Sequence, residues 1–198
     1  MPTDYGSLEA FEARLRNRIA SSTTNASGDS RALPERSEIN LLAEQLAKEM
    51  GLWMPYAESL NKGFPYPSGM ENDVYFDANS NSIVKINNLM VSRDVLSLLE
   101  RLQMHNVLFP QTAYSLEGFT GFGRGSIYPV LRQAYVANAT YATHGEILDY
   151  MESLGFTLCG EAAFTNGEVT ITDVRPRNVL KDNNDAIFVI DVDFVLSK

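Results

Sequence analysis

The stretch Asp173-Val174-Arg175-Pro176-Arg177-Asn178 lies between two segments that each predict a β-hairpin. Upstream, Asn166-Gly167 is flanked by alternating apolar residues across residues 163–172, the strongest short-range hairpin signal. Downstream, the polar turn at residues 182–185 separates two apolar runs, and the second run ends at Asp191. Local folding therefore brings the oxygens of Asp173, Asn178 and Asp191 together. Such a set suits Mg²⁺, which usually takes one or two carboxylates together with substrate phosphates.

The same residues resemble the catalytic loop and the metal-binding Asp of the protein-kinase-like superfamily. Asn178 follows Asp173 by 5 positions and Asp191 follows Asn178 by 13, the spacings usual in protein kinases. The resemblance implies that Asp173 is the catalytic base and that Asn178 and Asp191 bind Mg²⁺. Arg175 stands where kinases often carry a Lys that meets the transferred phosphate. More narrowly, residues 105–110 and 190–193 are similar to the kinase domain of large polyvalent proteins of phages and mobile elements.

The pattern D-x-x-x-x-N alone is weak, because Asp, Asn and Pro are ordinary turn formers. Its concurrence with both spacings, both hairpins and an upstream strand Lys favours the functional interpretation. That Lys is Lys85, inside the second of two strands predicted at residues 74–76 and 83–86. In kinases a strand Lys grips the α- and β-phosphates of ATP; the alternative is an outward-facing strand Lys. Residues 69–73, with one glycine, stand where a G-x-G-x-x-G cover would lie, which leaves the phosphate clamp undefined.

A helix is predicted over residues 92–104, in the position of the kinase regulatory helix. Its apolar positions define one face, and at roughly 100° per residue Glu100 projects nearly opposite that face. We therefore expect Glu100 at the surface, and Lys85 paired with Asp94 or directly with Asp191. The inward residues are Val95, Leu98, Leu99 and Leu102.

The glycine cluster at residues 121–125 follows no buried strand and opens no helix, so a hairpin turn is expected there. The next strand leads to residues 133–136, where the family's hinge would bind adenine, and this assigns Gln133 and Tyr135 to the nucleotide. A further helix begins at Thr143, whose capping box is completed by Glu146. Its inward positions are Ile147, Leu148, Met151 and Leu154, and His144 is expected at the surface.

Composition limits the other possibilities. The chain has 198 residues, 44% hydrophobic and 21% charged, which is typical of a soluble globular protein. One cysteine excludes an internal disulfide framework and, with two histidines, leaves no zinc site. The net charge of −9 argues against a nucleic-acid partner, and no apolar run is long enough for a membrane span. We expect a cytoplasmic protein.

The predicted domain organisation is an N-terminal helix and linker (residues 1–34), then a kinase-like domain (residues 35–198). The helix covers residues 8–20 and the linker begins at residue 21; a second helix follows, capped by Ser37. The expected fold is α+β, with a small antiparallel-sheet lobe to about residue 132 that carries the regulatory helix. A hinge at residues 133–136 joins it to a reduced, mostly helical second lobe at residues 137–198.

The resemblance implies an ATP- and Mg²⁺-dependent phosphotransferase. Asp173, Lys85 and Arg175 would be catalytic; Lys85, Gln133 and Tyr135 would bind ATP; Asn178 and Asp191 would hold the metal. The acceptor, a protein or a small molecule, is not specified by the sequence. The alternative is a catalytically silent kinase-like module that binds a partner protein or a nucleotide. Only seven residues follow Asp191, so the chain is either a minimal kinase-like domain or part of a longer protein.

Overall fold

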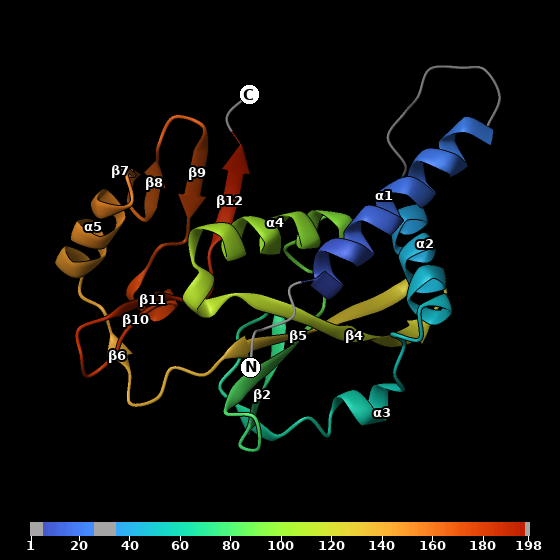
Figure 1. The fold of residues 1–198 in the computed structure, drawn as a ribbon, viewed down its shortest axis with the longest axis horizontal. Coiled ribbons are helices and arrows are strands. Elements are labelled where there is room, and N and C mark those ends of the chain that lie inside the picture. Colours follow the sequence, from blue (N-terminus) through green and yellow to red (C-terminus); the bar gives the residue numbers. More distant parts are fainter. Residues whose placement is uncertain (1–5, 26–34, 197–198) are drawn as a thin grey trace. The chain divides into compact units, whose positions relative to one another are not determined.

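The computed structural model describes residues 6–25 and 35–196 (Figure 1). The chain divides into two compact units, one formed by Met1–Gln103 with Tyr114–Tyr135 and the other by Met104–Ala113 with Val136–Lys198. Both units contain helices and antiparallel strands. The predicted α+β class is therefore confirmed. None of the described helices is long and apolar enough to cross a membrane.

The first unit is built on a five-stranded antiparallel sheet with the strand order β1-β2-β3-β5-β4. The strands are β1 (Phe64–Tyr66), β2 (Asn72–Asp77), β3 (Ser82–Asn87), β4 (Tyr114–Gly123) and β5 (Ser126–Ala134). The β2–β3 pair is the strand–turn–strand predicted around Lys85. In this pair Val74 lies opposite Lys85. The glycine cluster forms the β4–β5 turn as predicted, with Arg124 and Gly125 at φ 57° and 81°. Two successive residues with positive φ are the signature of the tight turn that matches strand twist.

Three helices cover one face of this sheet. They are α1 (Gly6–Asn25), α2 (Arg36–Glu49) and α4 (Val95–Leu108); a short helix, α3 (Tyr56–Ser59), precedes β1. The predicted inward face of α4 is confirmed, because all four of its apolar residues are buried. These residues share one core with apolar side chains of α1, α2, β4 and β5, including Phe11, Leu46, Phe119 and Leu131. The opposite face of the sheet carries a smaller cluster around Val84, Ile86 and Val130.

The N-terminal helix is longer than the sequence predicted. α1 continues through residues 21–25, which were expected to begin the linker, and residues 26–34 lie outside the described residues. Ser and Thr lower helix stability by only a few tenths of a kcal/mol each. The Ser21 and Ser22 hydroxyls also donate to the carbonyls of Asn17 and Ile19, so they are satisfied within the helix.

The second helix begins two residues earlier than predicted. Its N-cap is Glu35 and not Ser37, which already lies inside α2. A tertiary contact accounts for the difference, because Arg36 Nη2 donates to the Leu89 carbonyl at 2.8 Å. At the other end, Gly51 has φ 69°, and the amides of Gly51 and Leu52 donate to the carbonyls of Lys48 and Ala47. This is a Schellman motif, which glycine favours because it adopts left-handed backbone without strain.

The second unit consists mainly of short strands, so the predicted mostly helical character is wrong. Its described residues contain one complete α-helix, α5 (His144–Ser153), and seven strands in two sheets. The three-stranded sheet has the order β11-β10-β6 and the four-stranded sheet the order β12-β9-β8-β7. The members are β6 (Thr140–Tyr141), β7 (Thr157–Gly160), β8 (Ala163–Thr165), β9 (Val169–Thr172), β10 (Val179–Lys181), β11 (Ile187–Val189) and β12 (Asp193–Leu196).

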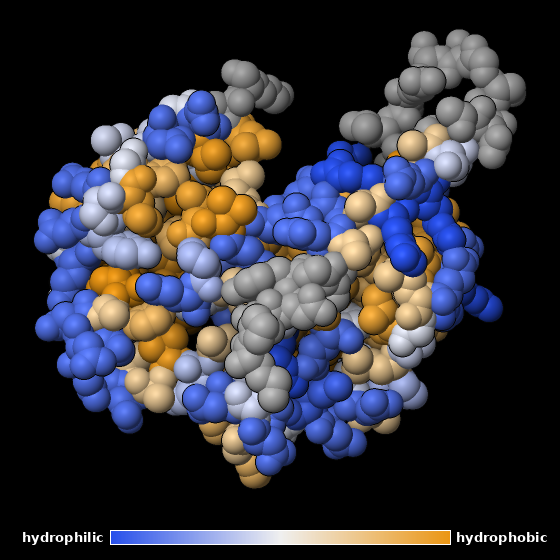
Figure 2. Space-filling model, in the orientation of Figure 1, coloured by the Kyte–Doolittle hydropathy of each residue, from blue (hydrophilic) through white to orange (hydrophobic). Residues whose placement is uncertain are grey.

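Both predicted hairpins are present in the second unit, as β8–β9 and β10–β11. Their turn residues impose strands on most of this short segment, which explains why little of it is helical. The predicted capping box of α5 is confirmed. Leu154 is 39% exposed, however, and not inward as expected, because it follows the last helical residue. The edge strand β12 ends in exposed Val195 and Leu196, near which Figure 2 shows hydrophobic side chains at the surface.

Candidate active site

The predicted catalytic loop leaves strand β9 through an unusual backbone conformation. β9 ends at Thr172, and Asp173 has φ 57°, in the left-handed region that Asp and Asn tolerate better than other side chains. The turn directs Val174 into the core, where it is 4% exposed and its amide donates to the Ala162 carbonyl at 3.0 Å. A 3₁₀ turn, η2 (Pro176–Asn178), follows. The loop therefore has a fixed backbone path from which the Asp173 side chain projects.

Asp173 and Asn178 contact each other directly. Asn178 Nδ2 donates to Asp173 Oδ2 at 2.8 Å and to the Asp173 carbonyl at 2.9 Å. Both neighbours are acceptors, so the amide orientation of Asn178 is fixed by chemistry: the nitrogen must face them. Asn178 is 9% exposed, and within the described residues its Oδ1 accepts no hydrogen bond. The contact thus leaves one oriented amide oxygen available.

Two arginines of the same loop enclose the other side of Asp173. Arg177 Nη2 lies 2.8 Å from both carboxylate oxygens, and Arg175 Nε lies 3.1 Å from Oδ1. The family resemblance implies a role for Arg175 and none for Arg177. The signal was available, since residues four apart across a tight helical turn can pair. Asp173 is therefore a carboxylate surrounded by donors rather than an isolated one.

Asp191 is brought to the same end of the strands. The Ile190 amide donates to the Asn178 carbonyl at 2.9 Å, and Asp193 is the strand partner of Thr172, which directly precedes Asp173. Asp191 lies between these two anchored positions. Its carboxylate is half-buried and forms no hydrogen bond or ion pair with any described residue. The second unit thus assembles the three oxygen-bearing residues that the spacing pointed to.

The donor set fits Mg²⁺ held jointly by protein and phosphate. In the described ranges, no group of three or more His, Cys, Asp or Glu side chains could hold a metal ion. The Asp191 carboxylate and the Asn178 amide oxygen supply instead one charged and one neutral oxygen. Mg²⁺ is usually bound in this way, through one or two carboxylates plus substrate phosphates and water, whereas an all-protein cage is uncommon for it.

Lys85 lies in the first unit and points into the core. It is 7% exposed, and it shares a sheet face with Leu131, which packs against α1, α2 and α4. The alternative of an outward-facing strand Lys is therefore wrong. Lys85 Nζ donates to the Tyr114 hydroxyl at 2.8 Å and lies 4.8 Å from the centre of its ring. Tyr114, on β4, was not recognised from the sequence, because nothing local marks it as a partner.

Two acids, Asp94 and Glu100, lie at the start of helix α4 and within it. Glu100 points away from the buried face, as its position on the helical wheel predicted. Its side chain is 46% exposed, and its carboxylate lies 2.6 Å from Arg16 Nη2 on α1. The prediction that Glu100 is a surface residue is confirmed. Asp94 is 2% exposed, and its Oδ1 accepts the Ser97 amide at 2.9 Å. Asp94 therefore caps the N-terminus of α4.

Gln133 and Tyr135, the residues assigned to adenine, lie at the end of β5. Gln133 is 3% exposed and pairs with Ile83 and Tyr114 across the sheet. The Tyr135 amide donates to the Asn81 carbonyl at 3.4 Å, and the Tyr135 ring centre lies 4.7 Å from that of Phe76. Their part in nucleotide binding stays a prediction.

The segment expected to cover the phosphates joins β1 to β2. Of residues 69–73, the last two begin β2, so the connection itself is shorter than assumed. Its tip is open to solvent, with Met70 82% exposed. Glu71 holds the connection to helix α4 through Arg101, at 2.7 Å, and both side chains are 14% exposed. A mostly buried ion pair thus stands where glycines would give a flexible cover.

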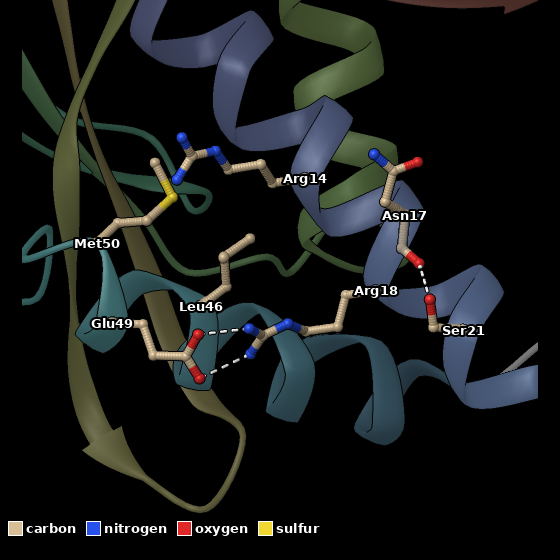
Figure 3. A pocket seen from close by; sticks show the side chains of 7 residues that line it. All are labelled: Arg14, Asn17, Arg18, Ser21, Leu46, Glu49 and Met50. Atoms are coloured by element: carbon tan, nitrogen blue, oxygen red, sulfur yellow. Dashed lines mark hydrogen bonds and ion pairs between the residues drawn. The ribbon is translucent and has the colours of Figure 1, made fainter. Parts of the chain in front are cut away.

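Among the hollows that the described residues form, one lies between two helices and one borders the catalytic loop. One, of about 550 Å³, lies between α1 and α2 and is lined by Arg14, Asn17, Arg18, Ser21, Leu46, Glu49 and Met50 (Figure 3). There Arg18 forms two hydrogen bonds with Glu49, and none of the predicted site residues lines this groove. The other hollow, of about 290 Å³, borders the catalytic loop and is lined by residues 174–177 together with His144, Glu161 and Ala162.

Comparison with models of protein families shows the family of the chain. Residues 36–198 match the model described as a serine/threonine/tyrosine kinase found in polyvalent proteins. The match includes the loop from Asp173 to Asn178, Asp191 and Lys85, and it leaves α1 outside. No curated protein matches the chain.

Proposed function

Because the chain belongs to the family of serine/threonine/tyrosine kinases found in polyvalent proteins, we propose that it transfers the terminal phosphoryl group of ATP to an acceptor hydroxyl with the help of Mg²⁺. The observation that carries the proposal is the Asp173–Asn178 contact. It orients a carboxylate and an amide oxygen side by side, and Asp191 follows the neighbouring strand with its carboxylate unpaired among the described residues.

Asp173 orients the acceptor hydroxyl and receives its proton. A carboxylate suits this step because phosphoryl transfer requires mainly positioning of the nucleophile, not a strong base. The rigid turn at Asp173 and its bond from Asn178 fix the direction of approach. Arg175, whose Nε lies 3.1 Å from Asp173 Oδ1, supplies positive charge beside the same oxygen. That charge stabilises the anionic oxygens of the group in transit.

Asn178 Oδ1 and the Asp191 carboxylate are the residues that hold the metal. When bound, Mg²⁺ neutralises charge on the phosphate oxygens and fixes their orientation. Because both Asn178 hydrogens are engaged by Asp173, its oxygen is preorganised and does not have to be turned on binding. Asp191 contributes the negative charge that draws the cation.

Lys85 positions the phosphates of the nucleotide. Burial at 7% exposure strengthens the interaction of its ammonium with phosphate oxygens, because little water competes. Tyr114 holds the ammonium by a hydrogen bond at 2.8 Å and by its ring face. We assign Gln133 and Tyr135, at the end of the same sheet, to the adenine site.

A thermal-shift titration tests the proposal. ATP at about 100-fold above Kd should raise the unfolding free energy by about 2.7 kcal/mol, and only when Mg²⁺ or Mn²⁺ is present. A matched series with ADP and with EDTA separates metal-dependent from metal-independent binding. An unchanged melting temperature at millimolar ATP with metal would contradict nucleotide binding and favour a silent module that binds a partner protein.

A further inference from the structure

The hollow beside the catalytic loop has walls of mixed chemistry. Val174 and Pro176 supply apolar surface, whereas Arg175, Arg177 and His144 supply nitrogen groups and Glu161 one carboxylate. Its volume of about 290 Å³ is enough for one side chain and too small for a nucleotide. Glu161 is on the rim, with 85% of its side chain exposed, whereas Arg175 is 44% exposed. The deeper charge in the wall is therefore positive.

The two guanidinium groups have donors to spare. A guanidinium carries five N–H donors in a planar fork. Arg177 uses only Nη2, on Asp173, and Arg175 uses Nε on Asp173 and Nη1 on Glu161. The remaining nitrogens, Nε and Nη1 of Arg177 and Nη2 of Arg175, have no partner among the residues that the structure describes. Each edge of a guanidinium that binds carboxylate through two parallel hydrogen bonds includes Nη2, so Nε and Nη1 of Arg177 offer single hydrogen bonds while Nη2 stays on Asp173.

The hollow belongs to the acceptor side of the loop. Neither Asn178 nor Asp191, the residues assigned to the metal, lines it. Asp173 lies between the metal-binding residues and the hollow. Its Oδ2 accepts a hydrogen bond from Asn178, and its Oδ1 pairs with Arg175. The acceptor hydroxyl must reach Asp173, and Arg177 Nη2 lies 2.8 Å from the Asp173 carboxylate. Groups attached to that hydroxyl therefore come close to the Arg177 guanidinium.

We propose that this hollow binds an acidic side chain next to the acceptor residue, so that the protein phosphorylates hydroxyl residues in acidic peptide segments. The inference rests on the proposed phosphotransferase function. Arg177 supplies the recognition through its unused Nε and Nη1, and Arg175 and His144 supply further positive or donor groups. An acidic side chain that takes two nitrogens from one edge of Arg177 also competes with Asp173 for Nη2, which frees the Asp173 carboxylate to receive the hydroxyl proton.

Three synthetic peptides of equal length test this assignment. Each carries one serine and one tyrosine, flanked by Asp and Glu, by Asn and Gln, or by Lys and Arg. With Mg²⁺ and ATP, we expect kcat/KM for the acidic peptide to exceed that of the neutral one about tenfold, the effect of one hydrogen bond to a charged group. Fluorescence anisotropy of the same peptides without nucleotide should give the same order of affinity.

Three variants change the preference to different extents and in different directions. Arg177→Glu should reverse it toward the basic peptide, and Arg177→Lys should keep part of the acidic preference. Glu161→Gln removes the competing carboxylate on the rim and should increase the affinity for the acidic peptide; at 85% exposure this change does not disturb the core. Melting temperatures of all variants exclude misfolding as the cause.

The outcomes distinguish this inference from the proposed function. If ATP with Mg²⁺ stabilises the protein but all three peptides bind and react equally, the acidic assignment is overturned and the phosphotransferase proposal stands. If ATP with Mg²⁺ gives no stabilisation and no turnover, the proposed function fails. The anisotropy order and its reversal in Arg177→Glu then still decide whether the hollow binds acidic side chains.

Discussion

Arg177 Nη2 lies 2.8 Å from each carboxylate oxygen of Asp173, so the candidate base is engaged by a cation from its own loop. A hydrogen bond between charged groups is stronger than a neutral one, although here a single nitrogen is shared between the two oxygens and no two-nitrogen fork is formed. Arg177 is itself 63% exposed, however, and the solvent that reaches it weakens the pair. The pair is thus strong enough to orient Asp173, and weak enough that Arg177 can exchange Asp173 for another carboxylate.

Substitutions at Asp173 and Asp191 should separate chemistry from metal binding. Asp173→Asn keeps the shape and tolerates the left-handed backbone, so ATP binding with Mg²⁺ should change little while turnover falls about 100-fold or more. Asp191→Asn removes the charged metal ligand and should weaken the metal-dependent binding itself. Calorimetry and turnover on both variants measure this. Equal loss of ATP affinity in the two variants would contradict the assigned roles.

Tyr114→Phe should destabilise the first unit and weaken ATP binding. The change removes the hydroxyl that accepts a hydrogen bond from Lys85 in a site where both residues are less than 8% exposed. Loss of one partner of a buried charged group costs about 1–3 kcal/mol. Urea unfolding measures it, with Tyr141→Phe as the control because Tyr141 is 67% exposed. An effect of equal size in the control would exclude a specific role of the Tyr114 hydroxyl.

Glu44→Ala should loosen the attachment of α2 to the sheet. Glu44 is 4% exposed; its Oε2 accepts the Gly125 amide at 2.7 Å, and its Oε1 pairs with Lys48. Removing both contacts should lower the unfolding free energy by about 1–3 kcal/mol. Gln45→Ala, at an exposed position of the same helix, is the control and should change it by less than about 0.5 kcal/mol. Equal unfolding free energies of Glu44→Ala and Gln45→Ala would show that the Gly125 contact is not stabilising.

Glu146 should make the second unit sensitive to acid. The hydrogen bond from Lys181, together with those from Thr143, lowers the pKa of the Glu146 carboxyl from 4.5 to about 2. Because the folded pKa is below the unfolded value, the stabilisation is complete above about pH 4.5 and is lost as the pH falls toward 2. The melting temperatures of the wild type and Glu146→Gln should therefore differ at pH 6 and converge near pH 2.

Glu152→Gln is the matched control for this pH dependence. Glu152 is exposed on the same helix, and its carboxylate has no hydrogen bond or ion pair among the described residues. Its replacement should leave the dependence of melting temperature on pH unchanged. A constant difference between wild type and Glu146→Gln from pH 6 down to pH 2 would show that the stabilisation does not come from the ionised carboxylate.

Much of the fold was predictable where local chemistry determines the structure. The Asn166-Gly167 turn, the turn at residues 182–185 and the Thr143 capping box each act within a few residues, and all are present. The outward direction of Glu100 followed from helical geometry alone. In each case the interacting groups are close in sequence, so the pattern contains the information.

Features that depend on distant contacts were missed. Lys85 and Tyr114 are 29 positions apart, and only the β3-β5-β4 strand order brings them together. The early start of α2 depends on Leu89, 53 positions beyond Arg36. The Arg177–Asp173 pair was overlooked for a different reason: the resemblance drew attention to Arg175 and supplied no role for its neighbour. The metal and nucleotide assignments stay predictions.

The left-handed backbone at Asp173 limits how this protein can diverge. At φ 57° only Gly, Asn and Asp fit comfortably, and other side chains cost about 1–2 kcal/mol. The replacements of Asp173 that do not strain the turn are therefore Asn and Gly. Both of them remove the acid. A descendant without this acid can thus arise by one substitution that does not strain the backbone of the turn. Selection for folding alone therefore does not preserve the carboxylate at this position, on which the proposed phosphoryl transfer depends.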